Sequence, residues 1–194
     1  MNPSEQELIE KAKQGDKYAF GELFDRYRNK ILGYLYRYMG DYQAAEDLTI
    51  TTFMNAYNNL AHYTEMGTFS SWLYKIATNC AKNELEKKGR RKENSLDEVA
   101  DDEKENRYMR ELMADEDARP DHLLMKKELK ELIYKVVAKL EKKYKEVLFL
   151  CDVEGLKYRE AAKVLKCNPM TIGTRLKHAR DILSVKLKKY RSQL

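Results

Sequence analysis

The chain has 194 residues, enough for one domain or two small ones, and 43% of them are hydrophobic. Three prolines and eight glycines in a sequence that is 36% charged favour an all-helical fold, with a net charge of +5. No apolar run approaches membrane-spanning length, and the N-terminus lacks the hydrophobic stretch of a signal peptide, so we expect no membrane insertion and a cytoplasmic location.

The positive charge is unevenly distributed along the chain. Residues 1–92 carry a net charge of +2, residues 93–124 carry −8 and residues 125–194 carry +11. The acidic segment, 93–124, has low hydrophobicity and high charge, so it is expected to be largely disordered on its own. The sequence therefore predicts two small helical domains, 1–92 and 125–194, joined by an acidic flexible linker, 93–124.

The cysteines and histidines indicate neither a disulfide framework nor a metal site. Cys80, Cys151 and Cys167 are odd in number and far apart, with no C-x-x-C pair, and the three histidines form no ligand cluster. No histidine lies near a plausible nucleophile, and no Gly-rich phosphate loop occurs. We therefore expect no catalytic residues, no metal and no cofactor.

Two helices are predicted before residue 40. Ser4 and Glu7 form a capping box that opens a short helix ended by Gly15, and Asp16 caps a longer helix that Gly40 stops. Apolar and aromatic residues recur in the longer helix every three or four positions, namely Phe20, Leu23, Phe24, Tyr27, Ile31, Tyr34 and Tyr38.

A third helix is predicted over residues 42–60, capped by Asp41, and a loop, AHYTEMGTF, follows it. The acidic pair Glu46 and Asp47 is expected to face solvent. The residues expected to be buried are Ala45, Leu48, Phe53 and Tyr57.

A fourth helix is predicted from Ser70, with the sequence SSWLYKIATNCAKNELEKKGRRK. It begins aromatic, becomes polar and ends in a basic cluster, and aromatic groups beside cations suit a surface that holds unstacked bases and follows phosphates. Two interpretations of Trp72 stay open, because a single tryptophan can equally be a core residue or a stacking platform.

The basic C-terminal third contains two predicted helices separated by a tight turn. The first carries Ala161, Ala162 and Leu165 as an apolar stripe, and Asn168 with Pro169 starts the second. The inner face of the second helix is predicted to be Ile172, Leu176, Ala179 and Leu183, and lysines and arginines cover most of the remainder. This pattern is typical of a DNA-binding helix-turn-helix, although a helical hairpin with a solvated lysine face fits it too.

Three stretches together resemble one family. GDKYAFGELFDRYRNKILGYLYRYMGDYQAAEDLTITTFMNAYNNL, FSSWLYKIATN and EGLKYREAAKVLKCNPMTIGTRLKHARDIL are similar to domains two and four of extracytoplasmic-function sigma factors, in that order, with the linker unmatched. The resemblance implies a non-enzymatic factor that binds core RNA polymerase, directs it to promoters and helps to melt the duplex. Family members are commonly held inactive by an anti-sigma factor, so such a partner is expected.

The resemblance also implies which residues contact the partners. Core polymerase would be bound by Glu46, Asp47, Leu48 and Phe53. The single-stranded minus-ten element would be held by His62, Tyr63, Trp72, Lys75, Asn79, Lys82, Arg90 and Arg91. Asn79 would lie in a pocket for a flipped base, where its amide offers a donor and an acceptor; a solvated helix residue is the alternative. The duplex minus-thirty-five element would be contacted by Asn168, Met170, Thr171, Thr174, Arg175, Lys177, His178 and Arg180.

The chain departs from the family pattern at both expected contact surfaces. Ile50 and Thr51 stand where the family usually has glutamine and glutamate, which removes polar groups from the polymerase-binding face. Gly173 and His178 replace a lysine and an arginine of the recognition helix. We therefore expect weaker or different reading of the minus-thirty-five element, with a DNA-bound recruiting partner to compensate.

The residues leave three functions open. The first is the sigma factor, the second is a stand-alone helix-turn-helix regulator that binds duplex DNA without polymerase, and the third is an interaction protein whose basic helices bind acidic protein partners.

Overall fold

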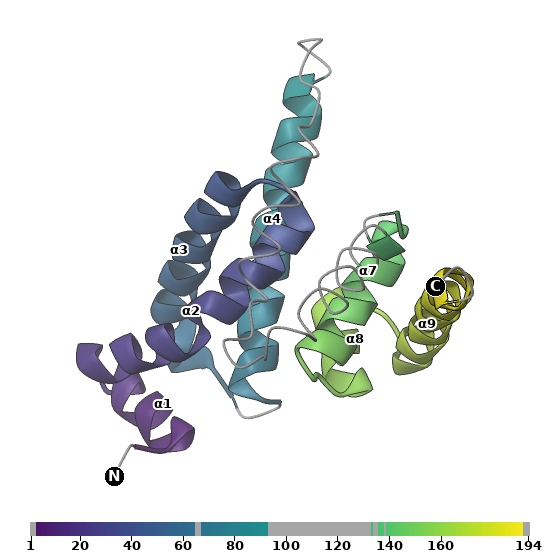
Figure 1. Cartoon of the computed structure of the whole chain (residues 1–194). Coiled ribbons are helices and arrows are strands. Elements are labelled where there is room, and N and C mark those ends of the chain that lie inside the picture. Colours follow the sequence, from purple (N-terminus) through teal and green to yellow (C-terminus); the bar gives the residue numbers. More distant parts are fainter. Residues whose placement is uncertain (1–2, 65–66, 93–132, 134–135, 138, 192–194) are drawn as a thin grey trace, which may run out of the picture. The chain divides into compact units, whose positions relative to one another are not determined.

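The computed structural model describes residues 3–64, 67–92, 133, 136–137 and 139–191, and every element in this part of the chain is helical (Figure 1). The expected all-helical fold is confirmed. The chain divides into two compact units, residues 1–100 and 101–194. The predicted domain bounds stay predictions, and the linker predicted over 93–124 lies outside the described residues.

Unit one contains α1 (Glu5–Lys13), α2 (Lys17–Met39), α3 (Tyr42–Asn59), the 3-10 helix η1 (Leu60–His62) and α4 (Phe69–Lys92). The predicted caps are present at the helix ends. The Ser4 and Glu7 capping box is closed by two bonds of 2.8 and 3.2 Å, and Asp16 accepts from two N–H groups at the start of α2. Gly40 ends α2 with φ of 70°, a left-handed conformation that glycine adopts without steric cost.

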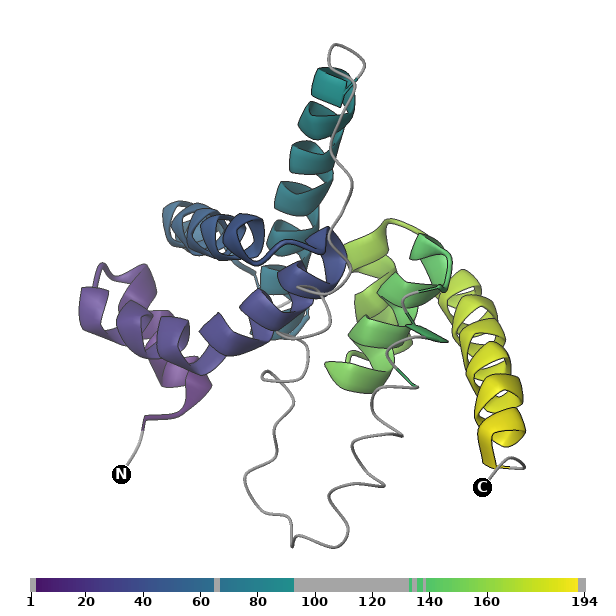
Figure 2. The same ribbon diagram turned by 45° about the horizontal axis from the view of Figure 1, so that its top comes forward.

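Helix α2 contacts α1, α3 and α4, so the core of unit one forms around it. At its centre the Thr78 hydroxyl donates to the carbonyl of Tyr74 at 2.7 Å and therefore accepts from the Tyr34 hydroxyl at 2.8 Å. This buried bond joins α2 to α4, whose C-terminal end projects beyond the other helices of the unit (Figures 1 and 2).

The N-terminus is attached to α2 by polar contacts. Arg26 Nη2 donates to the carbonyl of Pro3 at 2.8 Å, and the Tyr27 hydroxyl donates to the Glu5 carboxylate. Burial, and after it the bond to Glu5, raises the pKa of Tyr27, so the phenol stays protonated and remains a donor.

Unit two contains α7 (Lys142–Leu148), the π-helical turn η2 (Phe149–Val153), α8 (Tyr158–Leu165) and α9 (Pro169–Arg191). Its turn between α8 and α9 follows the predicted pattern, since Asn168 caps α9 and Pro169 begins it. Lys166 ends α8 with φ of 53°, and the Cys167 N–H donates to the Ala162 carbonyl at 3.0 Å. The core includes the predicted residues Ala161, Ala162, Leu165, Ile172, Leu176 and Ala179.

Two burial predictions were wrong. Tyr57 is 39% exposed, because only part of its ring is covered where it meets Phe20 of α2. Leu183 is only half-buried, because it lies one turn beyond Ala179, after which none of the described residues of α9 is buried. The loop predicted over 61–69 is shorter than expected, since η1 takes up its start and α4 begins at Phe69.

None of the helices among the described residues is long and apolar enough to cross a membrane. In the same residues, no group of three or more His, Cys, Asp or Glu side chains is arranged to hold a metal ion.

Candidate polymerase and nucleic-acid interfaces

Helices α2 and α3 form an apolar groove on the surface of unit one. The groove has a volume of about 370 Å³ and contains Ile50 and Met54, which are 53% and 61% exposed. Its complete lining is Phe20, Phe24, Ile50, Phe53, Met54, Tyr57 and Asn58. Exposed apolar residues gathered in one place indicate a surface that binds a partner.

The four residues predicted to bind core polymerase occupy different environments on α3. Leu48 and Phe53 are 8% and 3% exposed. The Phe53 ring packs edge-on against that of Phe24, with the ring centroids 4.7 Å apart. Asp47 is exposed, and the half-buried Glu46 lies 3.8 Å from Arg28. Leu48 and Phe53 therefore support the helix from inside.

Sequence reasoning did not identify Met54 as a surface residue. Ile50, Met54 and Tyr57 recur at intervals of four and three, which places them on one side of the helix, next to the buried face. That spacing could have revealed the groove, but the same residues also fit an extension of the core.

The start of α4 is fixed by an aromatic cluster. Tyr63 is buried, its ring lies 5.6 Å from Phe69 and 5.1 Å from Trp72, and its hydroxyl donates to the carbonyl of Gly67 at 3.1 Å. Lys13 of α1 lies over the same ring at 5.5 Å. Tyr63 therefore holds the chain before α4 in place, and the half-buried Trp72 both packs and keeps part of its surface exposed.

Four of the residues predicted to hold the minus-ten element share one face of α4. Trp72, Lys75, Asn79 and Lys82 follow one another at helical spacing, with Lys75 exposed and the other three half-buried. His62 is exposed in η1, and Arg90 and Arg91 belong to the last turn of α4. The face of α4 thus begins with an aromatic ring and continues with cations and an amide.

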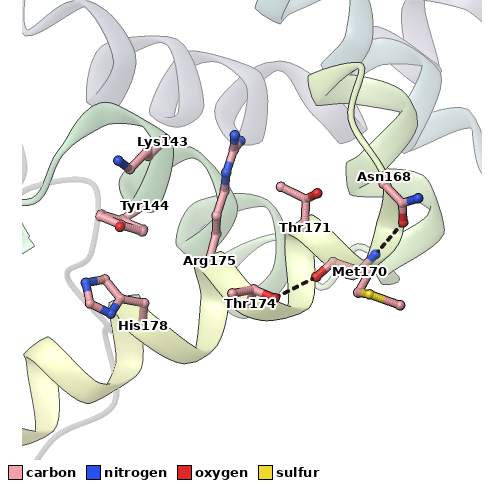
Figure 3. Close-up of a pocket in the computed structure, with 8 residues that line it drawn as sticks. All are labelled: Lys143, Tyr144, Asn168, Met170, Thr171, Thr174, Arg175 and His178. Carbon is pink, nitrogen blue, oxygen red and sulfur yellow. Dashed lines mark hydrogen bonds between the residues drawn. The ribbon is translucent and has the colours of Figure 1, made fainter.

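Unit two has a hollow of about 640 Å³ where α7 meets α9 (Figure 3). Six of the eight residues predicted for the minus-thirty-five element line it, together with two residues of α7 that sequence reasoning missed. The lining is Lys143, Tyr144, Asn168, Met170, Thr171, Thr174, Arg175 and His178. Lys143 and Tyr144 reach the hollow only because α7 packs against α9, and no local sequence pattern predicts that contact.

Contacts within the hollow fix its side chains. The Asn168 Oδ1 accepts from the Met170 N–H at 2.8 Å, and the Thr174 hydroxyl donates to the Met170 carbonyl at 3.1 Å (Figure 3). The centroid of the His178 ring lies 4.7 Å from that of the Tyr144 ring. Lys143 pairs with Glu141 at 2.7 Å, a contact that raises the pKa of Lys143.

The two remaining predicted residues lie outside this hollow. Lys177 is exposed, whereas Arg180 binds the Asp152 carboxylate through Nε at 3.0 Å and Nη2 at 2.5 Å. The two hydrogen bonds raise the pKa of Arg180. Arg180 therefore ties α9 to η2.

Comparison with known proteins places both units in one family. The model of sigma-70 region 2 matches residues 23–91, and that of sigma-70 region 4 matches residues 130–183. The ECF RNA polymerase sigma-E factor of Haemophilus influenzae is 32% identical over 184 residues, which are 95% of each chain. The chain belongs to the extracytoplasmic-function sigma factors of the sigma-70 family. This sigma factor directs RNA polymerase to promoters and is not an enzyme.

Two further similarities agree with the assignment. The RNA polymerase sigma-H factor of Pseudomonas aeruginosa is 33% identical to this sigma factor over 92% of this chain and 91% of its own. The sigma factor RpoE of Bartonella quintana, solved in complex with the anti-sigma factor NepR, has the same fold, with a TM-score of 0.66 at 21% identity over 87% of this chain and 96% of that one. Family membership decides among the three functions that the sequence left open.

The Arg180 and Asp152 pair of this sigma factor can be tested by a double-mutant cycle. We expect Arg180→Ala and Asp152→Ala to destabilise unit two by less in combination than the sum of the single effects, with a coupling of roughly 0.2–1 kcal/mol that shrinks in 1 M salt. Far-UV circular dichroism in urea would follow both units, and the fluorescence of Trp72, the one tryptophan of the chain, would follow unit one. Additive effects would show that the pair contributes no stability.

Proposed function

We propose that unit one binds core RNA polymerase through the groove face of α3 and holds the single-stranded minus-ten element along α4, while unit two puts α9 into the major groove at the minus-thirty-five element. The observation that carries this assignment is the succession of regions 2 and 4 in one chain, each with an exposed face of suitable chemistry. The apolar groove of α3 suits a protein partner, and the cations of α4 and α9 suit nucleic acid.

The polymerase contact is proposed to be more apolar than the family pattern. Ile50 and Met54 offer hydrocarbon and thioether surface, and Asp47 supplies an exposed carboxylate one turn earlier. Leu48 and Phe53 act indirectly, because they hold α3 against the core of unit one. Glu46, next to Arg28, stands at the edge of this surface.

A charge placed in the groove should disrupt polymerase binding. We expect Met54→Glu to raise the Kd for core RNA polymerase at least about tenfold, because burying an unpaired carboxylate costs several kcal/mol. Tyr18→Glu is the matched control, since Tyr18 is also a large exposed side chain and lies outside the groove. Equal Kd values for the two variants in an equilibrium titration would show that the groove is not part of the polymerase contact.

The minus-ten strand is proposed to run along the face of α4 that starts at Trp72. The exposed part of the Trp72 ring gives a base a surface to stack on, Lys75 and Lys82 lie where they can follow phosphates, and Asn79 can read an unpaired base edge. Tyr63 supports Trp72 from inside, and His62 is exposed just before this face. Arg90 and Arg91, in the last turn of α4, are proposed to add positive charge at its far end.

The minus-thirty-five contact is proposed to be weak, with Arg175 as the principal arginine of α9 toward DNA. Arg180 is held by Asp152, the His178 ring packs against that of Tyr144, and Gly173 adds no side chain. Asn168 uses one lone pair of its amide oxygen for the cap, which leaves its amide nitrogen as a donor toward DNA, and Lys177 adds an exposed cation. A DNA-bound recruiting partner would compensate for the missing contacts.

Restoring a lysine should strengthen this contact. We expect Gly173→Lys to raise promoter affinity several-fold, because glycine costs a helix about 1 kcal/mol relative to alanine, lysine is a good helix former, and the lysine adds a phosphate contact. A Cβ at this position would lie 3.5 Å from the Tyr158 ring, an ordinary van der Waals distance.

Gly21→Lys makes the same change in α2, where a Cβ meets nothing within 4 Å, and is the matched control for added charge. Unchanged affinity of the Gly173→Lys holoenzyme, measured by duplex titration at fixed salt, would contradict the proposed weakness of α9.

Regulation by an anti-sigma factor is proposed by analogy with the Bartonella quintana sigma factor, which was solved with one. Because polymerase and promoters are in the cytoplasm, the protein is proposed to act there.

Run-off transcription with purified core polymerase on a random promoter library tests the whole assignment. We expect new transcripts that share a minus-ten sequence only when this protein is added. A second shared sequence upstream would establish that α9 reads DNA, whereas stable core binding without transcripts would point to the recruiting partner. No core binding would overturn the proposed role of unit one.

A further inference from the structure

The start of α9 presents a large exposed apolar side chain. Met170, in its first turn, is 80% exposed, although it lines the hollow beside Thr171 and Thr174 (Figure 3). These residues share one face with Arg175 and His178, because they recur at helical spacing. The face that would enter the groove therefore begins with a thioether side chain.

Several polar atoms of this face are already bonded within the protein. The Thr174 hydroxyl donates to the Met170 carbonyl, which leaves its methyl group and its oxygen lone pairs for an outside partner. The Asn168 amide oxygen caps the helix, and the His178 ring packs against that of Tyr144 in a tilted arrangement. An outside partner of this face therefore meets methyl and thioether groups beside the guanidinium of Arg175.

Charge complementarity identifies nucleic acid as the occupant of the hollow. The cations Lys143 and Arg175 line it, and none of its lining residues is acidic; Glu141, the carboxylate partner of Lys143, is not among them. In the major groove of DNA, thymine is the base that carries a methyl group, and apolar side chains recognise it by contact with that group.

We infer that this sigma factor reads its upstream element through thymine methyl groups, contacted by Met170 and the methyl groups of Thr171 and Thr174, with Arg175 adding a polar contact at the same face. The inference rests on the proposed function of α9 and specifies its substrate as a thymine-bearing duplex. On this inference, the lysine and arginine missing from α9 are replaced by apolar contacts to thymine, so the element is recognised by different contacts.

The test uses holoenzyme assembled from core polymerase and the full chain, on a promoter selected from the random library. Each thymidine of the upstream element is replaced in turn by deoxyuridine, which removes the methyl group and keeps the base-pairing edge. We expect a loss of affinity of about fourfold at one or more positions, as for removing one buried methyl-sized group.

Met170→Ala completes the experiment. It should lower affinity for the thymidine duplex by several-fold and have no added effect on a duplex that already carries deoxyuridine at the contacted position. Val185→Ala is the matched control, since Val185 is an exposed apolar residue of α9 outside the hollow and should leave both affinities unchanged.

The outcomes separate the inference from the proposal beneath it. Binding that depends on the upstream element but is indifferent to deoxyuridine would overturn methyl reading and keep the proposed function of α9. Binding that ignores the upstream element altogether would overturn both. A deoxyuridine effect that persists unchanged in Met170→Ala would exclude Met170 as the reader.

Discussion

The aromatic row of α2 is the constraint on which unit one depends. Phe20 and Phe24 meet the rings of α3 edge-on, Tyr27 meets Phe69, and Tyr34 meets Tyr74 of α4 at 5.2 Å. Each such pair adds about 0.5–1.5 kcal/mol to the burial of its rings. Because the same helix supports α3 and α4, the proposed surfaces for polymerase and for the single strand are held by one element.

Unit two obtains its rigidity in a different way, from a short core and from polar ties across it. Ile172 and Leu176 are fully buried, which orients α9, and the Arg180 bond to Asp152 fixes its rotation against η2. The tilted contact between the His178 and Tyr144 rings adds a third point of contact. The exposed residues at the start of α9 are therefore presented by a helix that packs on α7 and α8 and is paired with η2.

The sequence predicted the helices well because their signals are local. Ser4, Asp16, Asp41 and Asn168 cap the helices that they were expected to cap, since capping needs only two or three neighbouring residues. Hydrophobic spacing also identified most of the core. Hydrophobic spacing does not show where a neighbouring helix stops covering a face, and for this reason the predicted burial of Tyr57 is wrong.

The functional surfaces were less accessible to sequence reasoning because they depend on contacts distant in the chain. Arg180 is held by Asp152, which lies 28 residues earlier in the chain, and Lys143 reaches the hollow only through tertiary packing.

The turn before α9 illustrates a compromise between strain and attraction. Lys166 adopts a left-handed conformation that costs a side-chain-bearing residue about 1 kcal/mol and would cost glycine nothing. Its side chain borders a second depression, together with Arg159 and Lys163. A lysine at this position therefore lowers the local stability of the turn, but it completes a cluster of three cations. The cluster strengthens the long-range electrostatic attraction between unit two and a polyanion.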